Sequence, residues 1–235
     1  MAELDSEGGL HIVSVPIGNL GDLSERAKTL LASVDRIACE DTRVTGKLLD
    51  KLGIKTKASL CSYRDENEGL LSEQIVAEIH SGAHYALLSD AGTPAISDPG
   101  FRLIRACRKA GLAVTALPGA CALINALCLS GLPTDGFLFL GFLPPKTAAR
   151  KKAFTTYREL PYTLILYESC HRIEKCIDDI ITVLGPDRVI SVCREMTKLH
   201  ETVSTGRAES VRKEIEKRSK KGEFVVLIAK QSYQH

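Results

Sequence analysis

The stretch LLSDAGTPAISDPG, residues 87–100, decides how this sequence is interpreted. An apolar segment ends there and is followed by two Ser, two Asp, two Pro, two Gly and one Thr. A tight turn needs only one Gly or Pro, often with an Asp. The excess predicts a shaped loop that forms one wall of a ligand site. Because the stretch contains no Lys, it does not match a phosphate-binding P-loop.

The segments around this loop alternate between strand and helix patterns. In the first half we expect strands at 10–15, 35–40, 57–63, 84–90 and 112–117, and helices at 23–33, 45–53, 66–82, 98–111 and 119–131. The fourth helix would have Asp98 as its N-cap and Pro99 as its first residue. Such alternation predicts a mostly parallel sheet with helices on its faces.

The second half has a different strand order. We expect strands at 136–145, 162–169, 188–193, 200–206 and 223–229, and helices at 147–158, 171–184 and 208–220. Short links between successive strands predict a mixed sheet. The predicted fold class is therefore α/β with two lobes, residues 1–118 and 119–235. A ligand cleft is expected between the lobes, where α/β proteins commonly bind ligands.

Composition narrows the class of protein. The chain has 235 residues, of which 44% are hydrophobic and 26% charged, as in ordinary globular proteins. The acidic N-terminus MAELDSEGG lacks an apolar export signal, which predicts a cytoplasmic location. The uncharged run 111–134 is broken by Pro118 and Gly119, so a strand, a turn and a buried helix explain it better than a membrane span. Eight Cys without CxxC or Cys/His spacing predict reduced thiols and no bound metal.

The net charge of +2 does not indicate nucleic-acid binding by itself. Two local basic clusters occur, at 146–152 and 212–221. The second cluster alternates with Glu residues, which is typical of a solvated helix face. The first follows two prolines and has no acidic neighbour before Glu159, so a polyanion contact and a solvated face both stay open.

Two more glycine-bearing turns follow strands of the first lobe. VPIGNLGDLSERA (15–27) leads into a helix capped by Ser24, and ALPGACA (116–122) repeats the order of strand end, Pro-Gly turn and helix start. Neither contains the GxGxxG or GxxxxGK[ST] pattern. Since all three turns follow strands of one predicted sheet, we expect them to form the rim of one pocket.

Polar residues are concentrated at four further strand ends. ACEDTR (38–43) and YRDENEG (63–69) lie in the first half, and YESCHRIEK (167–175) and CREMTKLHET (193–202) lie in the second. In the first pair, ion pairing and helix capping by Asp41 or Thr42 compete with a functional role. The second pair contains no HExxH motif and no nucleophile elbow.

Together, these motifs resemble the tetrapyrrole methylase superfamily, and within it the small-subunit ribosomal RNA methyltransferase I group. The resemblance extends from Leu10 to Ala229 and is most specific in SDAGTPAISDPG and EDTR. It implies two α/β lobes of the class III methyltransferase type, S-adenosylmethionine in the cleft, and a homodimer. The substrate it implies is the ribose 2′-oxygen of a cytidine in the 16S rRNA of the small ribosomal subunit, by resemblance cytidine 1402.

The resemblance also implies site residues. The expected methyl-donor contacts are Ile17, Asp90, Ala91, Gly92, Thr93, Ile96, Cys121, Ala122, Glu168 and Ile228. Candidates for the catalytic base are Glu40, Asp41 and Glu168, if burial raises their pKa. Candidates for holding the RNA are Arg43, Tyr63, Asn67, His171, Arg172, Arg194 and Lys198. Two positions depart from the pattern of the family: Cys170 replaces a usual Pro, and Cys121 replaces a small or hydroxyl residue.

Two other functions are considered. A methyltransferase of the same fold could act on a tetrapyrrole or another small molecule, although EDTR and YESCHR have no counterpart there. A non-catalytic RNA-binding module that retains the donor pocket is the second alternative. Transfer of label from the methyl donor to RNA separates both from the RNA methyltransferase.

Overall fold

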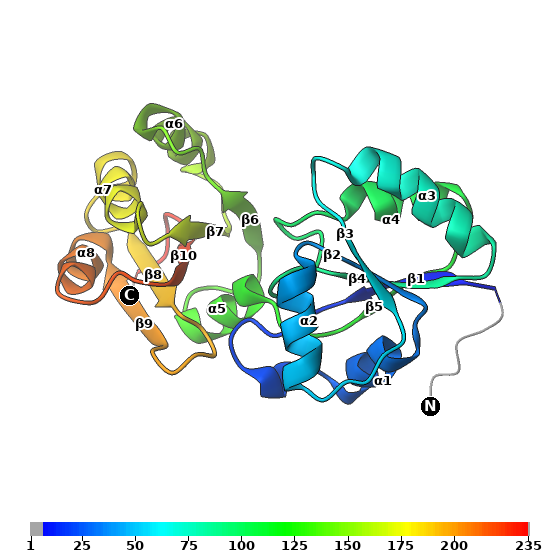
Figure 1. The fold of residues 1–235 in the computed structure, drawn as a ribbon. Coiled ribbons are helices and arrows are strands. Elements are labelled where there is room, and N and C mark those ends of the chain that lie inside the picture. The colour runs from blue at the N-terminus through cyan, green and yellow to red at the C-terminus, as the bar shows by residue number, and fades with distance from the viewer. Residues whose placement is uncertain (1–6, 235) are drawn as a thin grey trace. The chain divides into compact units, whose positions relative to one another are not determined.

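The computed structural model describes residues 7–234, so the acidic segment 1–6 lies outside the described residues. The chain forms two compact units, Met1–Cys121 and Ala122–His235 (Figure 1). Sequence analysis predicted the boundary between Pro118 and Gly119, within the Pro-Gly turn. In the structure the turn stays with the first unit, and the second unit begins with the helix that follows.

The first unit contains a five-stranded parallel sheet in the order β3-β2-β4-β1-β5. The predicted βα alternation is confirmed along its whole length. The elements are β1 (Gly9–Val13), the 3-10 helix η1 (Leu20–Asp22), α1 (Glu25–Ser33), β2 (Arg36–Cys39), α2 (Thr42–Lys51), β3 (Ser59–Ser62), α3 (Glu68–His80), β4 (His84–Leu88), α4 (Phe101–Lys109) and β5 (Val114–Leu117).

The second unit contains a mixed five-stranded sheet in the order β6-β7-β10-β8-β9. Only the pair β6/β7 is parallel, which confirms the predicted change of topology. The elements are α5 (Ala122–Ser130), β6 (Phe137–Phe142), α6 (Thr147–Tyr157), β7 (Thr163–Ser169), α7 (Ile173–Leu184), β8 (Val189–Arg194), β9 (Thr202–Arg207), α8 (Ala208–Glu216) and β10 (Glu223–Ile228).

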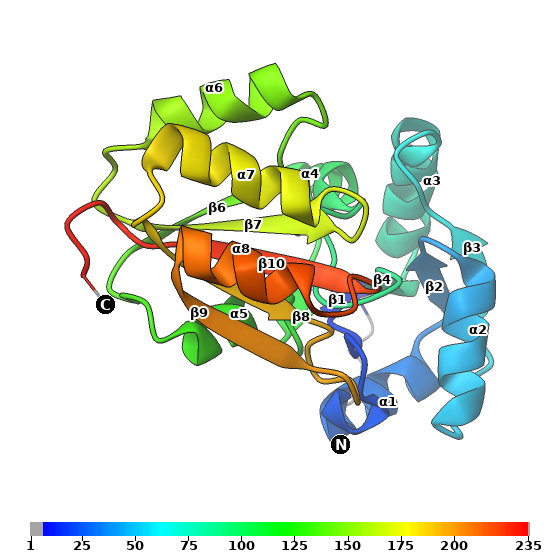
Figure 2. The same ribbon diagram turned by 90° about the vertical axis from the view of Figure 1, so that its left-hand side faces the viewer.

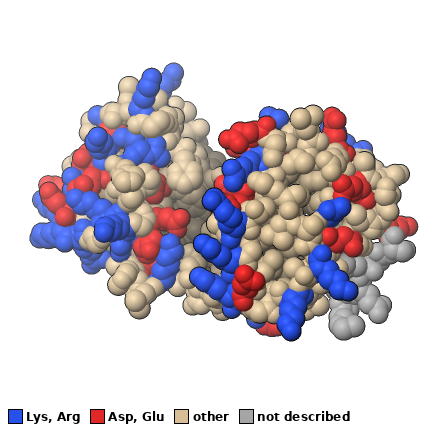
Figure 3. All heavy atoms as spheres, viewed as in Figure 1, with Lys and Arg blue, Asp and Glu red and all other residues tan. Residues whose placement is uncertain are grey.

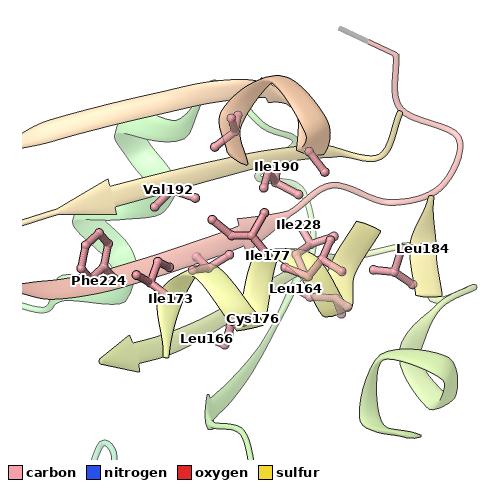
Figure 4. Close-up of a cluster of buried hydrophobic side chains, with 14 of the residues drawn as sticks. Leu164, Leu166, Ile173, Cys176, Ile177, Leu184, Ile190, Val192, Phe224 and Ile228 are labelled. Atoms are coloured by element: carbon pink, nitrogen blue, oxygen red, sulfur yellow. The ribbon is translucent and has the colours of Figure 1, made fainter. Parts of the chain in front are cut away.

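Each sheet is covered by helices on both faces. In the first unit one apolar cluster packs α1 and α2 against the sheet, and a second packs α3 and α4 against the opposite face. In the second unit α6, α7 and α8 cover one face over a core that includes Leu166, Ile177 and Phe224 (Figure 4). Helix α5 packs on the other face of that sheet (Figure 2).

The uncharged run 111–134 folds as predicted, into β5, a Pro-Gly turn and α5. No helix within residues 7–234 is long and apolar enough to cross a membrane. The same residues hold no group of three or more His, Cys, Asp or Glu arranged to bind a metal ion. All eight Cys are free thiols.

The predicted start of α4 is wrong. The helix begins at Phe101, and Gly100 rather than Asp98 occupies the N-cap position. The backbone amides of Gly100 and Arg102 donate instead to Oε1 of Glu68, each at 3.1 Å. Glu68 belongs to α3 and is only 5% exposed. A buried carboxylate from a neighbouring helix therefore caps α4, and the side chain of Asp98 is hydrogen-bonded to Ser89 instead.

Candidate functional site

Three loops interlock at the carboxyl edge of β1, β4 and β5. Val15 and Gly92 exchange two backbone hydrogen bonds of 2.8 and 3.1 Å. The hydroxyl of Thr93 lies 3.0 Å from Ser14 Oγ and donates to the carbonyl of Ala120 at 3.0 Å. The three predicted turns are therefore joined into one rim, because β4, β1 and β5 are neighbours in the sheet.

Two glycines allow this close approach. A Cβ on Gly119 would lie 2.7 Å from Cβ of Ser14, which is closer than side-chain carbons can pack. Gly92 has φ +78°, a left-handed conformation that glycine adopts readily, and a Cβ there would lie 3.3 Å from Cγ2 of Ile17. The first-unit residues expected to contact the methyl donor lie on or beside this rim: Ile17, Asp90, Ala91, Gly92, Thr93, Ile96 and Cys121.

The loop between β4 and α4 holds its backbone in a strained conformation. Ala95 has φ +67° and Ser97 has φ +66°, values that non-glycine residues rarely adopt. Such strain persists only where the surrounding structure imposes it, and it is concentrated at functional sites. Here the loop is held at one end by the Val15–Gly92 pairing and at the other by the contact of Gly100 with Glu68.

Carboxylates gather beside this loop. Asp90 Oδ1 accepts a hydrogen bond of 3.1 Å from the backbone amide of Asp41, which joins the ends of β4 and β2. Burial raises the pKa of Glu40, and the charge of Asp90 raises it further. Burial also raises the pKa of Asp90, although the hydrogen bond from the amide of Asp41 acts in the opposite direction.

Asp98 is the one of these carboxyl groups whose pKa is raised close to neutrality. Burial raises its pKa to about 6, and the negative charges of Glu40 and Asp90 add to the shift. Carboxyl groups with a pKa this close to neutrality are suited to accept protons in catalysis. Sequence analysis assigned Asp98 to a helix cap and so missed it. The signal available was the second Asp in a loop richer in polar residues than turns require.

Asp41 differs from its neighbours. It caps α2 through a 2.8 Å bond from the amide of Arg43, and the guanidinium of Arg43 lies 2.6 Å from its second oxygen. These bonds hold the pKa of Asp41 well below its usual range, although the group is solvent-accessible. A carboxylate stabilised in this way is a weak base, so the environment disfavours the catalytic role expected for Asp41.

Two other first-unit side chains expected to hold substrate have structural partners. Tyr63 is 1% exposed, and its hydroxyl lies 2.9 Å from Ser72 Oγ on α3. The amide group of Asn67 donates to the carbonyl of Ser62 and accepts from the amide of Arg64, which stabilises the turn before α3. Tyr63 therefore packs inside the unit. The side chain of Arg43 remains 82% exposed despite its ion pair.

In the second unit, Glu168 is buried and paired with Arg172 at 2.8 Å. Arg172 also donates to the carbonyl of Leu143, so the pair links β7 to the segment after β6. The second oxygen of Glu168, Oε2, is buried with no hydrogen-bond partner among the described residues. The fixed, paired position of Glu168 does not favour a catalytic base.

The remaining second-unit residues differ in accessibility. His171 is exposed, whereas Arg194 donates to the carbonyls of Lys221 and His200. Lys198 binds Glu195 and Glu223, at 2.9 and 2.8 Å. Ile228 is fully buried in the core beneath α7, so its side chain is not presented to a ligand in this unit. Ala122 is the first residue of α5.

The raised pKa of Asp98 predicts a specific pH dependence of stability. Between pH 3.8, its ordinary pKa, and about pH 6, the folded state binds more protons than the unfolded state. The free energy of unfolding therefore falls as pH rises through this window. Asp98→Asn should remove this loss, so the variant should melt at a higher temperature than the parent at pH 7.5 and at a similar temperature near pH 4. Thermal melts at both values test this, and identical differences at the two pH values would contradict it.

Comparison with known proteins places this geometry in context. Residues 9–212 match the family model "Tetrapyrrole (Corrin/Porphyrin) Methylases". The chain is 47% identical over 227 residues to the Ribosomal RNA small subunit methyltransferase I of Xylella fastidiosa (strain Temecula1), covering 96% of this chain and 82% of that protein. It is 46% identical to the protein of the same name from Escherichia coli O157:H7, covering 95% and 78%.

Solved structures share the fold at low sequence identity. Diphthine synthase aligns with a TM-score of 0.70 and 14% identity, over 94% of this chain and 89% of that one. The uroporphyrin-III C-methyltransferase of Thermus thermophilus, in a complex with S-adenyl homocysteine, aligns with a TM-score of 0.60 and 17% identity, over 94% and 97%. These likenesses support the two-unit α/β fold.

Proposed function

The chain belongs to the tetrapyrrole (corrin/porphyrin) methylase family, and from this premise we propose that it is an S-adenosylmethionine-dependent methyltransferase of small-subunit ribosomal RNA. The observation that carries the proposal is the interlocked rim of the three loops, which contains the expected donor-contact residues of the first unit. Relatives that are 42–48% identical over most of the chain carry the rRNA methyltransferase name.

The charges around the rim fit the proposed donor. S-adenosylmethionine supplies a methyl group bonded to a cationic sulfonium, which is a good leaving group. The rim loop 89–100 carries Asp90 and Asp98 and no Lys or Arg. An acidic, partly buried environment favours a cation, whereas a phosphate ligand would be repelled. The side chains present therefore fit the donor.

The protein has two tasks in such a reaction: to position the acceptor and to remove its proton. For the acceptor we propose the ribose 2′-oxygen of a cytidine, which is a weak nucleophile until its proton is removed. Asp98, with a pKa of about 6, is ionised at neutral pH and basic enough to take that proton. Glu40 is the second candidate, because its pKa is also raised and its charge acts on Asp98.

Labelled S-adenosylmethionine and small ribosomal subunits that lack the modification test the proposal directly. After incubation with the protein, the RNA is digested to nucleosides and analysed by mass spectrometry. We expect one methyl group on a cytidine ribose. Label on a nucleobase would contradict the proposal that the ribose 2′-oxygen is the methyl acceptor. Donor binding without any label in RNA would contradict the RNA substrate and favour a small-molecule acceptor or a binding-only role.

The quaternary structure and location are also proposals. By analogy with the family we propose a homodimer that acts in the cytoplasm, where small subunits are assembled. Light scattering of the purified protein at micromolar concentration distinguishes a dimer of about twice 25.6 kDa from a monomer.

A further inference from the structure

Helix α2 carries a line of cations on its exposed face. Arg43, Lys47 and Lys51 follow one another at intervals of four residues, and all three are exposed. Four residues of α-helix correspond to a rise of about 6 Å and a turn of about 40°, so the three cations form one gently curving stripe. The apolar side of the helix, with buried Leu49, faces the opposite direction and packs on the sheet.

Two of these cations have no acidic partner. Neither Lys47 nor Lys51 forms an ion pair with any residue between 7 and 234, although Asp50 lies next to Lys51 in the sequence. In Figure 3 blue atoms run along the position that α2 occupies in Figure 1. The first unit has 13 Lys and Arg against 16 Asp and Glu, so the stripe is a local feature of an otherwise acidic unit.

The basic clusters singled out in the sequence are partly neutralised by ion pairs. In the cluster at 212–221, Arg212, Arg218 and Lys220 all pair with carboxylates, which agrees with a solvated helix face. In the cluster at 146–152, Arg150 is buried against Asp179, and Lys151 lies 3.6 Å from the same residue. The α2 stripe, of which sequence analysis named only Arg43, differs from both clusters because it lies next to the carboxylates of the candidate site.

The stripe begins at the candidate site. Arg43 contacts Asp41, and the amide of Asp41 donates to Asp90 beside the rim. Beyond the far end of α2, the loop to β3 adds Lys55 and Lys57. A line of cations therefore leads from the carboxylates along the helix and past its end.

We propose that the α2 stripe binds successive backbone phosphates of a single-stranded segment of the substrate RNA and so guides the target ribose to the carboxylates. This inference rests on the proposed function. Evenly spaced cations, of which Lys47 and Lys51 have no ion pair among the described residues, suit a polyanion with regularly spaced charges. Such contacts contribute affinity without reading sequence. The sequence of the target would then be selected by other contacts.

The test compares two double variants of the full-length protein. Lys47→Ala/Lys51→Ala removes two members of the stripe. Arg105→Ala/Lys109→Ala is the matched control, because these residues are also exposed, four apart on one helix of the first unit, and without an ion pair among the described residues. Binding to small ribosomal subunits is measured by sedimentation at several salt concentrations, and donor affinity is measured by calorimetry.

We expect the stripe variant to bind subunits on the order of 10-fold more weakly than the parent at 0.1 M salt. The plot of log K against log salt should also become less steep by about 1.4, the value for two single-strand phosphate contacts. The control should match the parent. Donor affinity and melting temperature should be unchanged in both. The proposal that the stripe binds RNA would be contradicted if both variants lost the same affinity for subunits. It would also be contradicted if the stripe variant bound subunits within twofold of the parent.

The binding assay separates this inference from the proposed function. If the parent binds subunits and the stripe variant does not, but neither transfers methyl groups, RNA binding by the stripe is supported and the proposed activity is contradicted. If methyl transfer occurs and the stripe variant has the same KM as the parent, the proposed activity is supported and RNA binding by the stripe is contradicted. If the parent does not bind subunits even at low salt, the stripe is wrong.

Discussion

Replacing Asp98 by Asn is expected to lower kcat for methyl transfer by about 10²- to 10⁴-fold, the range that a positioned general base contributes. The variant keeps the shape of the side chain and its polar contacts but cannot accept the proton. Donor affinity should fall much less than kcat, because Asp90 keeps its charge and the rim is held by Thr93, Gly92 and Ala120 rather than by Asp98. Single-turnover kinetics with labelled donor measure the chemical step directly.

The pH dependence of the reaction rate identifies which carboxylate acts as the base. In the parent, kcat/KM should rise with pH through about 6, the pKa of Asp98 in the free protein, and then level off. Glu40→Gln removes one negative charge that acts on Asp98, so it should move this midpoint to lower pH. Glu66→Gln, an exposed carboxylate outside the site, is the control and should leave the profile unchanged. If Asp98→Asn retains more than a tenth of kcat while Glu40→Gln loses the activity, Glu40 is the base.

The second large effect concerns stability. Glu68→Ala should lower the free energy of unfolding of the first unit by about 2–4 kcal/mol, because it leaves the amides of Gly100 and Arg102 without an acceptor. The change also removes the 3.4 Å pair with Arg102. Urea unfolding monitored by circular dichroism measures the difference between variant and parent.

Two variants control for this result. Glu68→Gln keeps one oxygen at the same place and should lose clearly less stability than Glu68→Ala. Glu66→Ala, two residues earlier and exposed, should change stability by less than about 0.5 kcal/mol. Since Gly100 closes the loop 89–100, Glu68→Ala should also weaken donor binding. A loss of stability with unchanged donor affinity would show that the loop is held by its other end, at Val15 and Gly92.

Much of the fold was predictable because its signals are local. Each expected strand and helix is present, since apolar periodicity and glycine-bearing turns act over a few residues. The rim was predictable for a related reason. Parallel strands end at the same edge of a sheet, so loops that follow neighbouring strands must meet there. For the same reason the structure brings Glu40 and Asp41, at the end of β2, close to Asp90 at the end of β4.

Residue roles were less predictable. Asp98 and Pro99 match the local pattern of a helix start, yet a carboxylate from another helix, Glu68, binds the amides. Tyr63 and Arg150 looked accessible in a polar and a basic segment, and both are buried against partners on neighbouring helices. In each case the deciding partner comes from another helix, so the local sequence pattern does not show it.

The sequence alone therefore determined the two α/β units, the edge of the sheet that carries the rim, and the family, because these depend on short-range patterns and on motif identity. Only the tertiary structure decided which carboxylate is suited to accept a proton. A pKa depends on burial and on charges brought near by other strands: Arg43 holds the pKa of Asp41 low, whereas burial beside Glu40 and Asp90 raises that of Asp98.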